Sequence, residues 1–228
     1  SFDYSRYGEV FAEVMIAGNI VEPGGSLRGE ALPICVFTAP SSEQVYGAVE
    51  ILHQMMRRKP FLRARYDTVV VKLQLFLPSY TPEARQNFAC TVGLMMSRAM
   101  LTPSVLKEIG AESNVEGNFA LDFMTGVIQE FLKENENNAT KLMNLLRAAG
   151  MDMEAIVNLM PSKQRSAEEL SRYFERLGLE KLVEENERRV RQLKVADVRS
   201  GVAEQVAEGV PNEETAEWVD QKCQKTSV

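Results

Sequence analysis

The sequence predicts an all-α protein built as an α-solenoid, in which antiparallel helix pairs stack side by side. Apolar residues recur at spacings of three and four along nearly all of the 228 positions, a pattern typical of helices that bury one face. Breaks of Pro, Gly, Asn and Ser divide this pattern into roughly ten helices of ordinary length with short loops. Helices joined by short loops pack against their neighbours, and a row of such pairs forms a solenoid.

The first predicted helix carries an apolar stripe from Tyr7 to Val21. The Pro-Gly-Gly sequence at 23–25 should end it, because Pro lacks the backbone donor that a helix needs and Gly adopts turn conformations easily. A loop is then expected to continue to about Pro40.

A second helix should begin at Ser42, whose hydroxyl can cap it, and end near Arg58. The next stretch, between the prolines at 60 and 78, fits two patterns. Its apolar residues alternate as they would in a strand, and they also form a helical stripe. Strands mostly run about 4–8 residues, so the length of this stretch favours a helix.

The remaining helices are expected after start signals such as Thr-Pro, Ser or Asn. Ser166 and Glu169 form a capping box, and Gly201 is a candidate break in the longest helix. The expected helices cover residues 81–100, 102–110, 114–134, 140–149, 153–160, 166–178, 179–208 and 212–225. Since no repeat has a fixed period, irregular HEAT-like pairs fit better than tetratricopeptide or ankyrin repeats.

The composition argues against catalysis and against metal binding. The chain has one histidine, His53, and three widely spaced cysteines, whereas most acid–base sites use His and most zinc sites use close Cys/His sets. We therefore expect no enzyme activity, no cofactor and no metal. His53 is expected to be a surface or partly buried structural residue.

Charge and hydropathy indicate the compartment and exclude some partners. The net charge of −6 argues against nucleic-acid binding over a broad surface. A chain with this net charge can still carry a local basic patch. No apolar run approaches the ~20 residues of a membrane helix, and the sparse cysteines fit a reducing cytosol or nucleus. Because the chain begins without Met and stops after a helix-like segment, we expect it to be part of a longer protein.

One basic cluster at the turn after the second helix is the best local candidate for a binding site. One interpretation is a docking patch for an acidic protein segment or for RNA phosphate. The other is a positive helix end that satisfies its own dipole. The cluster consists of Arg57, Arg58, Lys59, Arg63 and Arg65. A second basic block, around Arg188 and Arg191, is expected to be a solvated helix face with ion pairs at i,i+4 spacing.

Several short motifs follow one another in a fixed order and cover nearly the whole chain to about residue 195. The motifs are Phe2-Asp3-Tyr4-Ser5-Arg6-Tyr7, Ala17-Gly18, Pro23-Gly24-Gly25, Cys35-Val36-Phe37, Arg57-Arg58, Gln164-Arg165-Ser166, Tyr173-Phe174 and Gly178-Leu179. In order and spacing they resemble the translation initiation factor five mimic proteins, also called basic leucine zipper and two-tryptophan-domain proteins. No basic region followed by leucine heptads supports the zipper of that name.

The resemblance implies a HEAT-like helical domain over residues 1–195, similar to the middle domain of initiation factor four G. It implies that residues 196–228 form a linker helix and the start of a truncated C-terminal two-tryptophan-type helical domain. In the family that second domain mimics the end of initiation factor five and contacts initiation factors two and three.

The function implied is a cytoplasmic regulator of translation initiation that acts by protein binding and competes with initiation factor five for factors two and three. Contacts with these factors and with the small ribosomal subunit are expected mainly through the absent C-terminal domain. The chain itself would be the helical scaffold. The alternative is a HEAT module that binds RNA or the ribosome directly, which the basic turn motivates.

Overall fold

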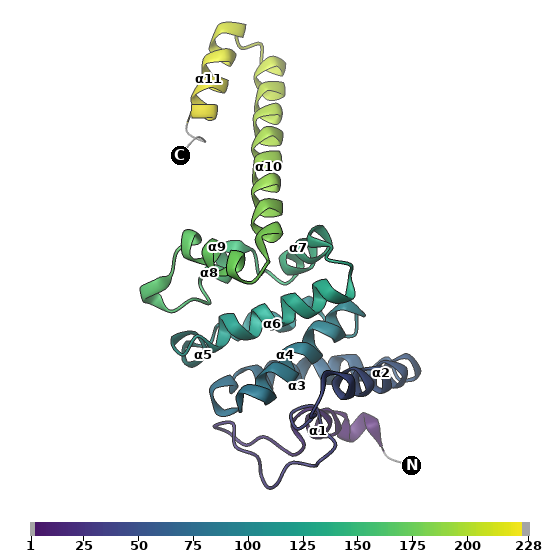
Figure 1. The fold of residues 1–228 in the computed structure, drawn as a ribbon. Helices are drawn as coiled ribbons and strands as arrows, with labels where there is room; N and C mark the ends of the chain where they lie inside the picture. The colour runs from purple at the N-terminus through teal and green to yellow at the C-terminus, as the bar shows by residue number, and fades with distance from the viewer. Residues whose placement is uncertain (1–2, 225–228) are drawn as a thin grey trace. The chain divides into compact units, whose positions relative to one another are not determined.

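The structure, a computed structural model, describes residues 3–224, and the chain divides into two compact units, Ser1–Leu177 and Gly178–Val228. Within the described residues, strand-like pairing is limited to one antiparallel bridge between Val21 and Leu27. All the other regular structure is helical, so the predicted all-α fold is confirmed (Figure 1).

The first helix, α1 (Tyr4–Ala17), ends four residues earlier than the sequence predicts. Gly18 has a φ of +88°, and its backbone N–H donates to Val14 O at 2.9 Å. This left-handed cap turns the chain out of the helix, which glycine allows without a steric cost. Val21 then lies beside α1, where its N–H donates to the Glu13 carboxylate at 2.5 Å.

The next three helices are α2 (Ser42–Arg58), α3 (Leu62–Gln74) and α4 (Pro82–Ser97). The prediction of a helix rather than a strand between the two prolines is confirmed by α3, which a short 3-10 turn, η1 (Leu77–Ser79), follows. The start of α4 is also as predicted, because Thr81 Oγ1 accepts a hydrogen bond from Ala84 N.

Two predicted helix starts differ from the structure. Ser41, not Ser42, occupies the N-cap of α2, and its side chain makes no capping hydrogen bond. The segment after Thr102 is a 3-10 helix that Thr102 does not cap, because its hydroxyl donates to Asp67 Oδ2 at 3.0 Å.

The helix predicted over 114–134 is two helices. The short helix α5 (Glu112–Glu116) is followed by Gly117, and Asn118, with a φ of +63°, is the N-cap of α6 (Phe119–Glu134). A left-handed residue cannot continue an α-helix, and Asn tolerates this conformation better than most side chains. The elements of this part of the chain are η2 (Pro103–Gly110), α5 (Glu112–Glu116), α6 (Phe119–Glu134), α7 (Ala139–Ala148), α8 (Met153–Val157), η3 (Ser162–Gln164) and α9 (Ala167–Arg176).

Helices α4 and α6 form the central pair of the first unit. Two glycines let them approach closely: a Cβ on Gly93 would lie 2.7 Å from Val127 O, and a Cβ on Gly126 would lie 2.8 Å from Ala89 Cβ. The ring centroids of Phe88 and Phe123 are 5.0 Å apart across the same pair. Side chains packed at this density make both helices intolerant of added volume.

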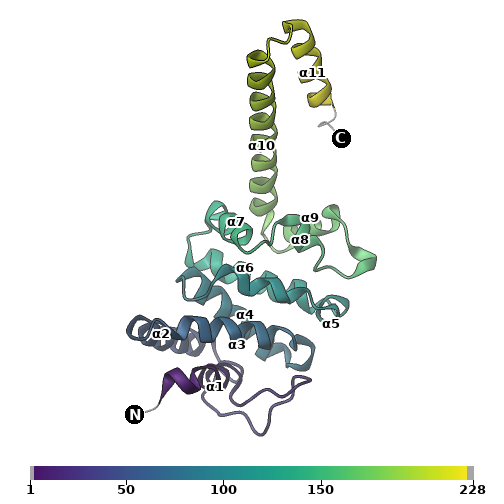
Figure 2. The same cartoon turned by 180° about the vertical axis from the view of Figure 1, so that it is seen from behind.

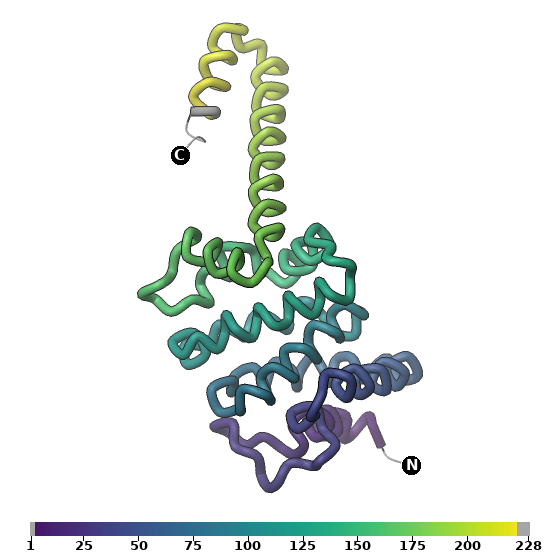
Figure 3. Tube along the Cα trace, viewed as in Figure 1, coloured from purple at the N-terminus to yellow at the C-terminus, as the bar shows by residue number. Residues whose placement is uncertain are grey.

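The elements of the first unit follow one another through space in chain order. Viewed from either side, α1, then α2 and α3, then α4 and α6, then α7 to α9 lie in successive layers (Figure 2). The Cα trace from residue 3 to 177 runs from one end of the stack to the other (Figure 3). Each layer therefore buries apolar residues against its neighbours, as in a solenoid.

The second unit contains α10 (Glu180–Ala207) and α11 (Asn212–Gln224). Gly201 does not break α10 as the sequence suggested; instead, a Cβ there would lie 2.3 Å from the Trp218 ring of α11. The basic block of α10 is exposed and carries ion pairs within the helix, including Arg188 with Glu185 at 2.8 Å. This matches the solvated face predicted for it.

Candidate partner-binding site

The predicted basic cluster lies at the turn between α2 and α3. Lys59 follows the last residue of α2 and has left the helical region, with a φ of −136° and a ψ of 75°, because a residue before proline disfavours the helical conformation. Pro60 then leads into α3, and Leu62 N donates to Lys59 O at 3.0 Å. This tight turn places the end of α2 and the start of α3 on one edge of the stack, with their basic side chains close together.

The structure divides the five predicted basic residues into two groups. Lys59 Nζ lies 5.2 Å from the centre of the Tyr4 ring, and Arg65 Nη1 pairs with Glu9 Oε1 at 2.7 Å. These two cations hold the turn against α1 and are largely committed to that contact. Arg57 and Arg58 are exposed and form no ion pair with any residue of the described chain.

Arg63 is intermediate between the cations that contact α1 and the exposed arginines without an ion pair. Its Nη2 donates to Leu101 O at 3.0 Å, which fixes the guanidinium beside the end of α4. A guanidinium carries five N–H donors, so most of them remain available after one such bond.

A cavity of about 180 Å³ lies at this edge of the first unit. Three arginines and one histidine line it, and the apolar walls between them include Met56 and Pro60. The four are His53, Arg57, Arg63 and Arg98. The structure thus brings two residues of the predicted cluster to the cavity, and it adds two that sequence reasoning did not assign to the site.

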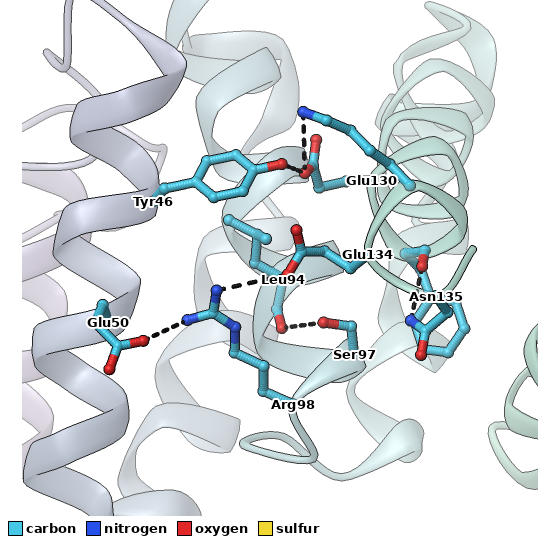
Figure 4. A network of polar contacts seen from close by, with 10 residues as sticks. Tyr46, Glu50, Leu94, Ser97, Arg98, Glu130, Glu134 and Asn135 are labelled. Atoms are coloured by element: carbon cyan, nitrogen blue, oxygen red, sulfur yellow. Dashed lines mark hydrogen bonds and ion pairs between the residues drawn. The ribbon is translucent and has the colours of Figure 1, made fainter. Parts of the chain in front are cut away.

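Arg98 is the residue that the sequence could not place. It follows α4 directly, and its guanidinium pairs with Glu50 Oε2 at 2.9 Å and with Glu134 Oε2 at 3.5 Å (Figure 4). The nearest signal in the sequence is its position at a helix end: Arg98 is the C-cap of α4, and Arg57 is the second-to-last residue of α2. That signal alone does not tell which two helix ends meet in space.

A second polar cluster links α2 and α6 beside the Arg98 pairs (Figure 4). Tyr46 Oη donates to Glu130 Oε1, and Lys133 Nζ lies 3.7 Å from the same carboxylate oxygen. Burial, and then the Glu130 charge, raise the pKa of the neighbouring Cys90 thiol to about 12. A thiol held in its neutral form at neutral pH is a poor nucleophile. We therefore interpret this cluster as a structural contact between α2 and α6.

The described residues contain no group of three or more His, Cys, Asp or Glu side chains able to hold a metal ion. No helix within residues 3–224 combines the length and the apolar character needed to cross a membrane. The charged groups that the cavity offers to a partner are Arg57 and Arg63, because Arg98 is already paired with Glu50 and Glu134.

Comparison with known proteins identifies the fold that carries this site. The family model of the 5MP1/2 HEAT domain matches residues 1–196. The chain belongs to the 5MP1/2 HEAT domain family. The expected HEAT-like solenoid and the resemblance to initiation factor five mimic proteins are both confirmed by this match.

The relatives of this HEAT domain include eIF5-mimic protein 2 of Gallus gallus and of Homo sapiens, each 26% identical over 99% of this chain and 54% of the relative. Protein krasavietz of Drosophila melanogaster is 24% identical over the same shares of both chains. The chain thus spans about half the length of the curated relatives that it matches. No solved structure matches it.

Several of the motifs that carried the resemblance have structural roles in this HEAT domain. Asp3 caps α1, since its Oδ1 accepts from Ser5 N at 3.0 Å and from Arg6 N at 3.2 Å. A Cβ on Gly18 would lie 2.9 Å from Cys35 Sγ, and one on Gly25 would lie 2.6 Å from Ser79 Oγ. These motifs close the turns around α1 and its loop, whereas Arg57 and Arg58 are the motif residues exposed at the candidate site.

Proposed function

We propose that this chain is the helical scaffold part of a cytoplasmic regulator of translation initiation. It acts by protein–protein binding and competes with initiation factor five for initiation factors two and three. The observation that carries the proposal is the match of the 5MP1/2 HEAT domain to residues 1–196, together with relatives that bear the name eIF5-mimic protein. The partners are proposed from this family, not from any contact in the structure.

The physical features of the chain support binding rather than chemistry. Stacked helices form a rigid scaffold with extended surfaces, which is how helical solenoids hold protein partners. Among the described cysteines, the pKa of the Cys90 thiol is raised, which makes it less reactive, and the clearest functional feature is the group of arginines at the cavity. We propose in addition that residues 196–228 lead into a C-terminal two-tryptophan-type domain, through which most contacts with the initiation factors and the small ribosomal subunit are made.

A competition assay tests the proposal. Labelled initiation factor five is bound to purified factor two or factor three, and the 228-residue chain is titrated in, with a full-length eIF5-mimic relative run in parallel. Displacement by the chain supports a contact surface within these residues. If the relative displaces factor five and the chain does not, competition resides outside this HEAT domain and the chain serves only as a spacer.

A second candidate function is direct binding of RNA or of the ribosome. Arg57 and Arg58 favour it, because both are exposed and form no ion pair within the described chain. Phosphate contacts release counterions, so the affinity for RNA should fall steeply with salt, whereas an apolar protein interface responds weakly. RNA binding that survives charge reversal at both arginines would exclude this turn as the RNA contact.

A further inference from the structure

We infer that the cavity at the α2–α3 turn is a binding site for the anionic group of an acidic protein segment, either a carboxylate or a phosphate monoester. Arg57 and Arg63, which form no ion pair within the described chain, contact the anion, and Arg98, already paired with Glu50 and Glu134, lines the same cavity. This inference rests on the proposed function, since it names the chemistry of a partner that the scaffold binds. Neither the family match nor the names of the relatives assign this site.

The two residues from α2 are placed by helix geometry. His53 and Arg57 are four positions apart in α2, so their side chains lie one turn apart on the same face. Met56, 7% exposed, anchors this end of the helix in the core. Because this helix end is firmly packed, Arg57 has a fixed place in the cavity wall, and its side chain is exposed to solvent.

The two other arginines are oriented by contacts with neighbouring elements. Arg63 is held through Leu101 O at 3.0 Å, and Arg98 is held between Glu50 and Glu134 at 2.9 and 3.5 Å (Figure 4). A guanidinium fixed in this way loses little further freedom when an anion arrives, which favours binding. Arginine clusters of this kind recognise carboxylate and phosphate groups through paired, charge-assisted hydrogen bonds.

The size of the cavity fits one anionic side chain. Its volume of about 180 Å³ compares with the ~30 Å³ that one water occupies in the liquid. That space holds a single phosphate or carboxylate together with part of the carbon chain that carries it. The apolar walls, which include Met56, Pro60 and Met100, suit the carbon chain.

The distribution of charge favours an acidic protein segment over RNA. A strand of RNA needs a continuous basic groove, usually with aromatic side chains on which its bases stack. Here Lys59 and Arg65 are engaged with Tyr4 and Glu9, which leaves too few accessible cations to follow a phosphate backbone.

Titration with short peptides tests the inference. The probes are the C-terminally amidated peptide Gly-Gln-pSer-Gln-Gly and two analogues with Glu or Ser in place of phosphoserine, and calorimetry at moderate salt measures their binding. We expect the phosphoserine or the glutamate peptide to bind and the serine analogue to bind at least tenfold more weakly. Whichever anionic peptide binds more tightly identifies the source of the anion, and inorganic phosphate should compete with it.

Two adjacent arginines provide a matched pair of variants. Arg57 lines the cavity, whereas Arg58 is equally exposed and lies outside its lining. We expect Arg57→Ala to weaken peptide binding at least tenfold and Arg58→Ala to change it less than twofold. Neither side chain makes an ion pair within the described chain, so both variants should melt at the temperature of the parent protein, and a melting curve checks this.

Three outcomes would overturn the inference: no binding of either anionic peptide, equal losses from the two variants, or a single-stranded RNA oligonucleotide that binds more tightly than both peptides. The competition assay described above, repeated with Arg57→Ala, separates this failure from failure of the proposed function. If the chain displaces initiation factor five with and without Arg57, the function stands and the cavity is not the contact.

Discussion

Arg98 Nη1 lies 2.9 Å from Glu50 Oε2, and this ion pair joins the end of α4 to the middle of α2. The other terminal nitrogen of the same guanidinium reaches Glu134, the last residue of α6 (Figure 4). One side chain therefore ties together three helices that lie far apart in the sequence. Because the Arg98 side chain is only 23% exposed, solvent screens these contacts less than it would on an open surface.

Replacing Arg98 should destabilise the fold. Arg98→Ala leaves the Glu134 carboxylate, itself 25% exposed, without its partner, and we expect the free energy of unfolding to fall by roughly 1–2 kcal/mol. Arg172→Ala is the control, since it removes an exposed i,i+3 pair with Glu169 and should cost less than about 0.5 kcal/mol. Urea unfolding measures both, and equal losses would contradict a bridging role for Arg98.

The N-caps of α4 and α2 offer a second comparison. Thr81 Oγ1 accepts from Ala84 N at 3.2 Å, whereas the Ser41 side chain makes no capping hydrogen bond. Thr81→Ala should lower the free energy of unfolding by about 1 kcal/mol, and Ser41→Ala should change it by only a few tenths. Thermal melts compare the stability lost in the two variants. If Ser41→Ala lost as much stability as Thr81→Ala, Ser41 would cap α2 in solution.

These two caps also mark how far the sequence predicts the fold. Thr81 and Ser166 are local signals, and both cap helices in the structure as their patterns indicate. The errors arise where distant residues compete for the same groups. Thr102 has the sequence of a cap, but its hydroxyl donates a hydrogen bond to Asp67, 35 positions away. No local pattern reports such a contact.

The candidate site shows the same limit. The sequence groups five basic residues by their nearness along the chain, and the structure retains Arg57 and Arg63 at the cavity. It diverts Arg65 to Glu9, 56 positions away, and brings Arg98 into the lining from α4. The location of the cluster could be predicted, but its composition depends on how the helices stack.

The glycines of α4 and α2 should respond in opposite directions to an added methyl group. A Cβ on Gly93 would lie 2.7 Å from Val127 O and 2.8 Å from Glu130 Cβ, whereas nothing lies within 4 Å of one on Gly47. We expect Gly93→Ala to destabilise by roughly 1–3 kcal/mol through overpacking. Gly47→Ala should stabilise by up to about 1 kcal/mol, because alanine favours the helix.

Chemical unfolding of the two variants tests the close approach of α4 and α6. If the two variants had the same free energy of unfolding, α4 and α6 would not be packed as closely at Gly93 as the structure shows. Both substitutions remove a helical glycine, so the difference between them isolates the contact with Val127 and Glu130 from the change in helix propensity.

The Cys90 thiol should resist alkylation at neutral pH. Burial first, and then the Glu130 carboxylate, raise its pKa from 9.0 to about 12, so at pH 8 its thiolate fraction should be about a thousandfold below that of an unperturbed thiol. The resulting contribution to stability is complete below pH 9 and is lost as the pH rises toward 12. Iodoacetamide labelling, read peptide by peptide in a mass spectrometer against N-acetylcysteine, measures the rate.

Glu130→Gln removes the carboxylate charge that raises the pKa of Cys90 but leaves most of the burial of the thiol. Cys90 should therefore react several-fold faster in this variant than in the parent protein, and still more slowly than N-acetylcysteine. Glu175→Gln, an exposed substitution on α9, should leave the rate unchanged. A parent Cys90 that reacts as fast as the free thiol would show that the cluster joining α2 and α6 opens in solution, which would also loosen the helices that position Arg98 and the cavity.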